Sequence, residues 1–184
     1  MNRIIYAVAA ILLLPGCNKG PKVELKNATA KQVASAVNQS GLMNGDTMIE
    51  PGLWQSKVTI AEMSIPGLPP QYAEKMKQSM ARTRDETSSH CITKADVKKP
   101  KEDFFGADRS CKYQHFQMGG GKIDIQMDCR EEGSVETTNM SGTYTPTTYS
   151  MDMSAKGSSG DRNGMTMKMH VDSHRIGECT GNEG

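Results

Sequence analysis

Long hydrophobic runs are nearly absent from this chain of 184 residues. The one uninterrupted apolar run, from Ile4 to Leu14, has 11 residues, whereas a helix that crosses a bilayer needs about 20. We therefore expect no transmembrane helix. Aromatic residues make up only 5% of the chain and include a single tryptophan, so a hydrophobic core must rely on aliphatic and methionine side chains.

An excess of one charge sign is also missing. The chain has 22 Lys and Arg residues against 21 Asp and Glu residues. Loss of residues 1–16 would remove Arg3 and no acid, which leaves no formal net charge. Proteins that bind nucleic acids or anionic surfaces by long-range attraction carry a marked positive charge. The composition therefore predicts no nucleic-acid partner and no attraction of the whole chain to an anionic surface.

The N-terminus resembles the export signal of a bacterial lipoprotein. Arg3 gives a positive start, the apolar run follows, and Leu14-Pro15-Gly16-Cys17 resembles the lipobox, in which the chain is cut before an acylated cysteine. We predict a signal peptide over residues 1–16, fatty acyl groups such as palmitate on Cys17, and an outer-membrane location facing the periplasm, which Asn18 favours. The alternative is a plain secretory signal in which Cys17 has no special role.

Four cysteines remain after Cys17, and an even number in an oxidising compartment predicts two disulfides. Cys111 and Cys129 are equally far from Gly120, so a hairpin turn at Gly119–Gly121 sets them opposite each other. The same register pairs Tyr113 with Met127, His115 with Ile125 and Gln117 with Ile123. Because neighbouring strands of a meander run in opposite directions, a bridge from Cys129 to Cys179 would span the sheet. We therefore predict Cys111–Cys129 and Cys91–Cys179.

The remaining pattern divides the chain into a tether and one domain. Residues 17–50 are expected to form a lipid-anchored tether with a short helix, which Asn27 or Thr29 begins and Gly41 ends. A β domain follows over residues 51–180, with a tail at 181–184.

Alternating apolar residues in the β domain predict six strands, from the Trp54 strand to the strand that starts near Met165. Short links make these strands a curved antiparallel meander, which enough twist would curl towards a partial barrel. The fold class is mainly β (α+β), with one or two short helices packed on the sheet. One helix, from Gln71 to about Arg84, carries an apolar stripe of Tyr72, Met76 and Met80 that we expect to lie on the sheet.

Methionines gather on one face of the last strands. In the alternating register, six of them share that face: Met140, Met151, Met153, Met165, Met167 and Met169. We interpret them as a pliable apolar interior, and an apolar ligand pocket lined by the same six residues is the candidate binding site if that interior is not filled. Thioethers also suit Cu(I), and His170 follows Met169 directly, so a copper site is the alternative. On a strand, however, His170 points to the opposite face from these methionines.

Several motifs together resemble the bacterial domain-of-unknown-function family 3617. They are Pro51-Gly52-Leu53-Trp54, Ile65-Pro66-Gly67-Leu68-Pro69, Cys91-Ile92-Thr93, Cys111-Lys112-Tyr113, Gly142-Thr143-Tyr144 and Arg175-Ile176-Gly177-Glu178-Cys179. Ile92 stands where the family usually has Leu, and Lys94 where it usually has Pro. The resemblance implies an exported, often lipid-anchored envelope protein, and it brings no established catalytic residue.

The sequence thus predicts an uncharacterised lipid-anchored envelope protein that is not an enzyme. We expect a binding or structural module with no cofactor and no bound metal. Its partners would be the membrane, through the N-terminal lipid, and a hydrophobic ligand or another envelope protein at the methionine face. A periplasmic copper-handling protein is the second hypothesis. An envelope hydrolase is the third, although spacing alone supports no pair of catalytic carboxylates and no serine triad.

Overall fold

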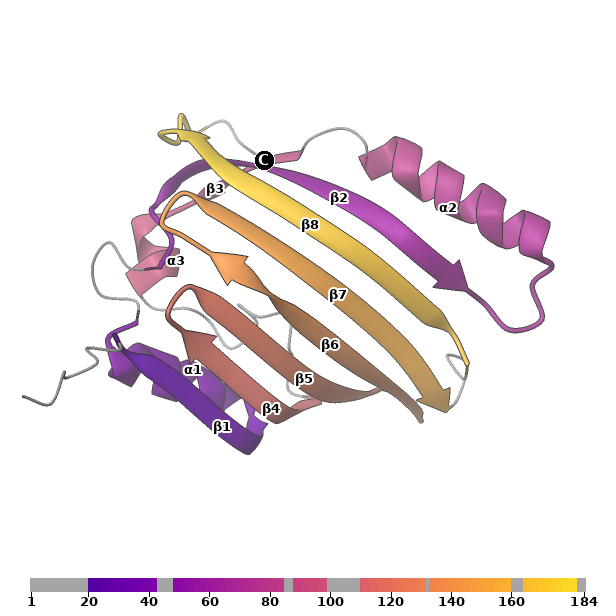
Figure 1. Cartoon of the computed structure of the whole chain (residues 1–184), viewed down its shortest axis with the longest axis horizontal. Coiled ribbons are helices and arrows are strands. Elements are labelled where there is room, and N and C mark those ends of the chain that lie inside the picture. The colour runs from indigo at the N-terminus through magenta and orange to yellow at the C-terminus, as the bar shows by residue number, and fades with distance from the viewer. Residues whose placement is uncertain are drawn as a thin grey trace, which may run out of the picture.

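The protein is built on one open antiparallel sheet, and we describe residues 20–42, 48–84, 88–98, 110–131, 133–159 and 164–181 of a computed structural model (Figure 1). The strands are β1 (Lys22–Thr29), β2 (Gly52–Ser64), β3 (Ser88–Ile92), β4 (Cys111–Gly119), β5 (Lys122–Glu131), β6 (Ser134–Tyr144), β7 (Thr148–Ser159) and β8 (Thr166–Gly177). The helices are α1 (Ala30–Ser40), α2 (Pro70–Arg84) and α3 (Lys94–Lys98). The strand order is β1-β4-β5-β6-β7-β8-β2-β3. The predicted β-rich α+β class is confirmed, with eight strands in place of six.

The meander from β4 to β8 follows the alternation of the sequence. Tyr144 pairs with Tyr149, and Gly142 pairs with Met151, as the pattern predicts. In the β4–β5 hairpin, Cys111 opposes Cys129 and the two-residue turn has positive φ angles at Gly120 (60°) and Gly121 (74°). These angles suit glycine and match the right-handed twist of the flanking strands.

The predicted register of this hairpin is wrong between Tyr113 and the turn. A register shift lies between Tyr113 and His115, so Phe116 pairs with Ile125 in the place that we assigned to His115. Gln117 pairs with Asp124, and not with Ile123. The extra residue of a bulge moves the following side chains to the other face of a strand. It brings Phe116 and Met118 to the apolar face and sends His115 to the polar one.

Residues 22–40 belong to the folded domain, whereas we expected a tether up to residue 50. β1 pairs with β4 along its whole length, for example Val23 with Met118. The predicted helix is present as α1, with a capping box between Thr29 and Gln32 and a left-handed Gly41 at its end. Val33 and Val37 of α1 are buried in the main core. The signal peptide and Cys17 lie outside the described residues.

Two halves of the sheet differ in how their apolar face is filled. The helix-covered half consists of β1, β4, β5 and β6 with α1, which packs against β1 and β4. Its core contains Phe116 and Tyr113, both 0% exposed and in edge-to-face contact with ring centroids 5.6 Å apart. The methionine half consists of β7, β8, β2 and α2. Its apolar face carries Met153, Met167 and Met169, which are only partly buried.

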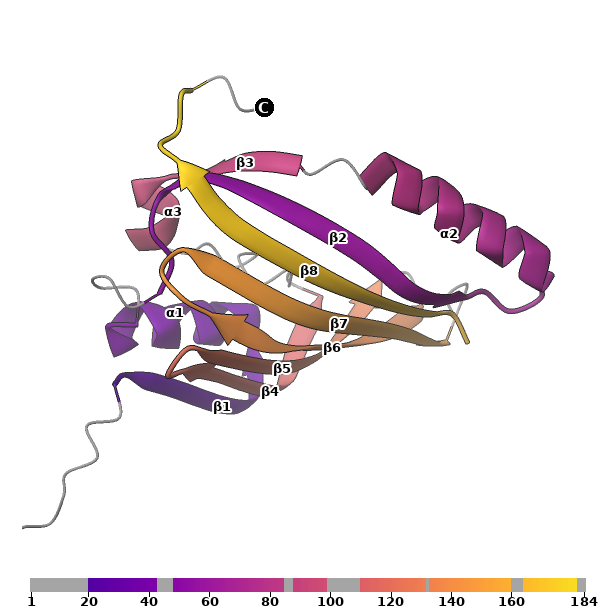
Figure 2. The same cartoon turned by 45° about the horizontal axis from the view of Figure 1, so that its top comes forward.

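Helix α2 does not bury the stripe that we predicted to lie on the sheet. α2 packs against β2 and extends along the outer side of the sheet, as Figures 1 and 2 show. Tyr72 is 52% exposed and Met76 is 43% exposed. The side chain of Met80 lies outside the described part. Among the described residues, no helix is both long enough and apolar enough to cross a membrane.

Both predicted disulfides are present. Cys111–Cys129 bridges β4 and β5 inside the helix-covered half. Cys91–Cys179 joins β3 to the residues that follow β8. The second bridge therefore connects one edge of the sheet to the end of the last strand.

Candidate functional site

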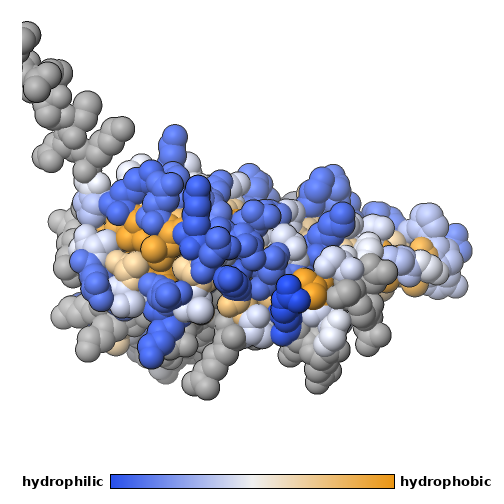
Figure 3. All heavy atoms as spheres, turned by 90° about the horizontal axis from the view of Figure 1, so that it is seen from below, coloured by the Kyte–Doolittle hydropathy of each residue, from blue (hydrophilic) through white to orange (hydrophobic). Residues whose placement is uncertain are grey.

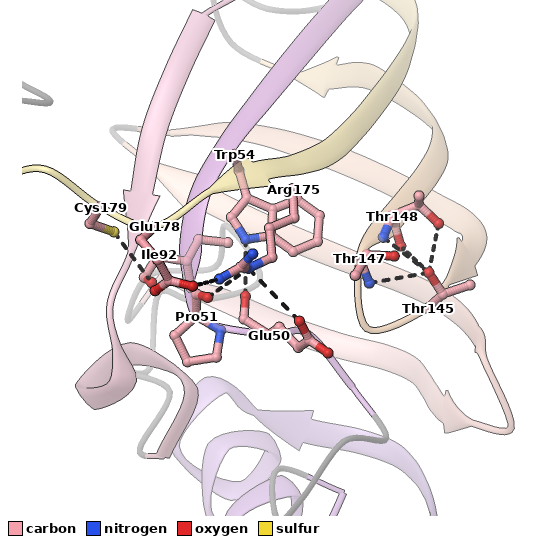
Figure 4. A network of polar contacts seen from close by, with 10 residues as sticks. All are labelled: Glu50, Pro51, Trp54, Ile92, Thr145, Thr147, Thr148, Arg175, Glu178 and Cys179. Atoms are coloured by element: carbon pink, nitrogen blue, oxygen red, sulfur yellow. Dashed lines mark hydrogen bonds and ion pairs between the residues drawn. The ribbon is translucent and has the colours of Figure 1, made fainter.

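Three of the motifs that carried the family resemblance meet where β2 begins and β8 ends, namely Pro51–Trp54, Cys91–Thr93 and Arg175–Cys179. Arg175 of β8 donates through Nε to the Pro51 carbonyl at 2.9 Å, forms an ion pair with Glu178, and lies 3.8 Å from the Glu50 carboxylate (Figure 4). Trp54 donates from its indole nitrogen to the Glu50 carbonyl at 3.0 Å. The hydrogen bonds to the carbonyls of Glu50 and Pro51 hold the backbone where the chain enters β2.

Gly52 is required in this arrangement because Arg175 occupies the space of a side chain. A Cβ at Gly52 would lie 2.5 Å from Arg175 Nε and 2.5 Å from the Gly177 carbonyl, and the φ of Gly52 is +151°. Trp54 is fully buried and stacks on Tyr149 with ring centroids 5.7 Å apart. The indole of Trp54 is therefore part of the packed interior, and these motif residues have a structural role.

The candidate binding site lies on the apolar face of the methionine half and extends onto the neighbouring strands β5 and β6. A cavity of about 220 Å³ is lined mainly by methionines of β5 to β8, namely Met127, Met140, Met153, Met167 and Met169. A second cavity of about 250 Å³ is lined by Met63, Ile65, Met76, Met165 and Met167. Glu136, Ala155 and Met167 line both, so the two cavities adjoin and form one elongated groove. We call it the methionine groove.

The predicted pocket residues are brought together in large part. Five of the six methionines line the methionine groove: Met140, Met153, Met165, Met167 and Met169. Met151 shares their face but lines neither cavity; it opposes Gly142 and Val171 in the sheet. Met140 is buried, while the others remain partly accessible.

Sequence reasoning missed three methionines of the groove, Met63, Met76 and Met127. Met63 of β2 pairs with Met167, but a register shift after Ile60 breaks the alternation that would have revealed it. Met76 of α2 reaches the second cavity, although α2 was expected to lie flat on the sheet. An isolated methionine beyond a strand's regular pattern was the only signal for Met63.

The opposite, polar face has a shallow cavity of about 520 Å³ with a charged cluster at its edge. His170 Nδ1 lies 2.7 Å from Asp152 Oδ1, and His170 Nε2 lies 3.1 Å from Asp172 Oδ1 and 3.2 Å from Ser150 Oγ. The hydrogen bond to Asp152, supported by that to Asp172, raises the pKa of His170. The hydrogen bond that Ser150 donates to Asp172 lowers the pKa of that carboxyl.

The contacts of His170 resemble those in a serine-hydrolase triad, with Ser150 at one ring nitrogen and Asp152 at the other. The spacing of these residues in the sequence did not reveal this arrangement. In such a triad, neutral histidine accepts the serine proton through Nε2. Here the Asp172 carboxylate also faces Nε2 and favours the imidazolium, which has no lone pair to accept a proton. The cluster is therefore better suited to joining β7 and β8 by ion pairs than to activating Ser150.

The geometry also separates His170 from the methionines of the copper hypothesis. His170 reaches Asp152 on the polar face, whereas Met167 and Met169 line the groove on the other face. Within the described ranges, no group of three or more His, Cys, Asp or Glu side chains is arranged to hold a metal ion.

Comparisons with known proteins give one match. Neither a curated protein nor a solved structure matches the chain. The family described as "Protein of unknown function (DUF3617)" matches residues 49–179, which include the Arg175 contacts, both disulfides and all the methionines of the groove. The chain therefore belongs to the DUF3617 family, as its motifs predicted.

Proposed function

We propose that this protein is a lipid-anchored protein of the bacterial envelope that binds an apolar ligand of the acyl-chain class in the methionine groove and performs no catalysis. One observation carries the proposal: two adjoining cavities of about 220 and 250 Å³ extend over the less filled half of the sheet, and methionines contribute eight of the sixteen residues that line them. Together they fall in the range of about 300–1,000 Å³ that is typical of small-molecule sites.

The shape and chemistry of the groove favour a long, flexible, apolar ligand. The groove extends from Met140 of β6 to Met63 of β2, and so crosses several strands. Methionine is unbranched and polarisable, so it adapts to ligands of different shape. Among the described residues, Glu136 is the one carboxylate that lines both cavities, and the rest of the lining is largely apolar.

The proposed anchor would hold this groove close to a bilayer. Cys17 precedes the start of β1 at Lys22 by five residues. An extended chain covers at most about 3.6 Å per residue, so the sheet edge would lie within about 18 Å of an acylated Cys17. A source of acyl chains would then be near the groove.

A groove-filling variant tests the binding site. Ala155 lines both cavities, so Ala155→Phe should fill the space they share. Ala61 lines only the cavity of the polar face, which makes Ala61→Phe the matched control. The measurement is the fluorescence of N-phenyl-1-naphthylamine titrated with residues 18–184, which retain every described residue, followed by displacement with palmitate.

We expect saturable uptake that palmitate reverses, at least about tenfold weaker in Ala155→Phe and unchanged in Ala61→Phe. A tenfold change corresponds to about 1.4 kcal/mol, less than the burial of one large apolar side chain. Circular dichroism should show that both variants fold. No saturable uptake by the wild-type chain, or equal uptake by the two folded variants, would overturn the proposal.

A further inference from the structure

We propose that α2 docks on the surface of an anionic lipid bilayer through the face that carries Tyr72 and Met76. In the described residues, the large hydrophobic side chains that are exposed are Tyr72, Met76 and Ile176, and two of these lie one helical turn apart on α2. Figure 3 shows apolar atoms reaching the surface at the right-hand end of the molecule, where α2 lies. Residues four apart on a helix share a face, so this is one continuous apolar stripe.

The charge of α2 matches an anionic surface, although the whole chain is nearly neutral. Its sequence has four basic residues, Lys75, Lys77, Arg82 and Arg84, against one acid, Glu74. Lys75 Nζ lies over the Tyr72 ring, 5.9 Å from its centroid, so a cation accompanies the apolar stripe. A basic helix with an exposed apolar face is the pattern of interfacial helices, whose lysines reach the headgroups while the apolar residues enter the acyl boundary.

The position of α2 leaves this stripe available to a bilayer. α2 contacts the sheet through β2 and projects beyond it at the far end of the molecule (Figures 1 and 2). Ala73 and Lys77 are its partly buried residues among those whose side chains are described, whereas Tyr72 and Met76 are 52% and 43% exposed. One face of α2 thus packs against the sheet, and the face with Tyr72 and Met76 is accessible to a bilayer.

The docking face is also continuous with the methionine groove. Met76 is 43% exposed and at the same time lines the second cavity with Met63 and Met165. A bilayer in contact with Met76 would adjoin the end of the groove. Docking of α2 does not require that the groove bind a ligand, because the stripe and its lysines are surface features.

Vesicle flotation tests the docking face without the lipid anchor. Residues 18–184 are mixed with vesicles of phosphatidylglycerol and phosphatidylethanolamine, or of phosphatidylcholine alone, and the bound fraction is measured. We expect binding to the anionic vesicles that falls with added salt, since exposed charges are screened over about 10 Å at 0.1 M. The double variant Tyr72→Ser/Met76→Ser should bind at least about tenfold more weakly, because two large apolar contacts are lost.

Ile176→Ser is the matched control, since Ile176 is 46% exposed but lies in β8. Its vesicle binding should equal that of the wild type. Failure of the wild-type chain to float with anionic vesicles, or an equal loss in both variants, would overturn the docking of α2. N-phenyl-1-naphthylamine uptake without vesicles remains a separate readout, so this failure is distinguishable from failure of the groove to bind ligand.

Discussion

Met118 and Met169 lie on the same apolar face of one sheet, yet their surroundings differ. Met118 in the helix-covered half is 2% exposed beneath α1 and the rings of the core, whereas Met169 in the methionine half borders a cavity. A methionine that fills a closed core contributes packing, and one that borders a groove remains free to adapt. The comparison suggests that α1 stabilises the domain while the methionine half is available for binding.

The largest expected effect on stability concerns the two disulfides. Cys91 and Cys179 are 88 residues apart, against 18 for Cys111 and Cys129. In the chain-entropy model, closing loops of these lengths stabilises a fold by about 4.6 and about 3.2 kcal/mol. Urea unfolding of Cys91→Ser/Cys179→Ser should therefore show a greater loss of stability than that of Cys111→Ser/Cys129→Ser. The reverse order would mean that these disulfides do not stabilise the fold mainly by restricting the unfolded chain.

A matched pair of truncations tests the packing difference directly. Met118→Ala should cost about 2–5 kcal/mol of unfolding free energy, because it leaves a cavity in a closed core. Met169→Ala should cost about 1 kcal/mol, since its side chain already borders empty space. Urea unfolding of both variants gives the two values. Equal costs would show that the methionine half is as tightly packed as the other.

The helix-covered half contains one polar group that weakens it. Tyr113 Oη is buried without a hydrogen-bond partner among the described residues, and burial raises the pKa of Tyr113 to about 12. A buried hydroxyl without a partner costs about 1–3 kcal/mol. Tyr113→Phe should therefore raise the unfolding free energy by about 1 kcal/mol. A loss of stability in this variant would instead reveal a hydrogen bond made by that hydroxyl.

The smallest expected effect is the pH dependence of the His170 cluster in the methionine half. The folded pKa of His170 is raised above its ordinary value of 6.5, chiefly by the hydrogen bond to Asp152. Its contribution to stability is therefore fully present below pH 6.5 and is lost as the pH rises through the raised value. Because the cluster is largely exposed, we expect less than about 1 kcal/mol. His170→Gln should be less stable than the wild type at pH 6 and similar at pH 9.

The difference in unfolding free energy between the wild type and His170→Gln separates the effect of His170 from that of His90. Burial lowers the pKa of His90, so its effect on stability has the opposite sign and weakens the fold as the pH falls. His90 is present in both proteins, so its effect cancels. A difference in stability that does not change between pH 6 and pH 9 would contradict the assignment to His170.

Sequence reasoning succeeded where strands are regular and adjacent in the chain. The β6–β7 register follows from alternation alone, because no irregularity interrupts it between Met140 and Tyr144. It failed at Gln114 and after Ile60, since a bulge reverses the face of every later residue without a clear mark in the sequence. β1 was missed because its partner β4 lies far along the chain and its exposed residues are strongly polar.

The candidate site was predicted correctly only where its residues lie on regular strands. Five methionines of regular strands were placed correctly, whereas Met63 follows a bulge and Met76 depends on how a helix meets a sheet. The Ser150–His170–Asp152 contacts arise from pairing of β7 with β8, which joins residues that no motif connects.

The strand order has a consequence for how the chain folds. β1 and β2 are the first strands in sequence, but their partners in the meander are β4 and β8. Val23 therefore pairs with the distant Met118, and Val58 pairs with the distant Val171. Local hairpins form quickly, whereas pairing of distant strands is slower because closing a long loop costs entropy. We therefore expect the hairpins between β4 and β8 to form the nucleus, and the earliest part of the chain to be synthesised to add to both sides of it last.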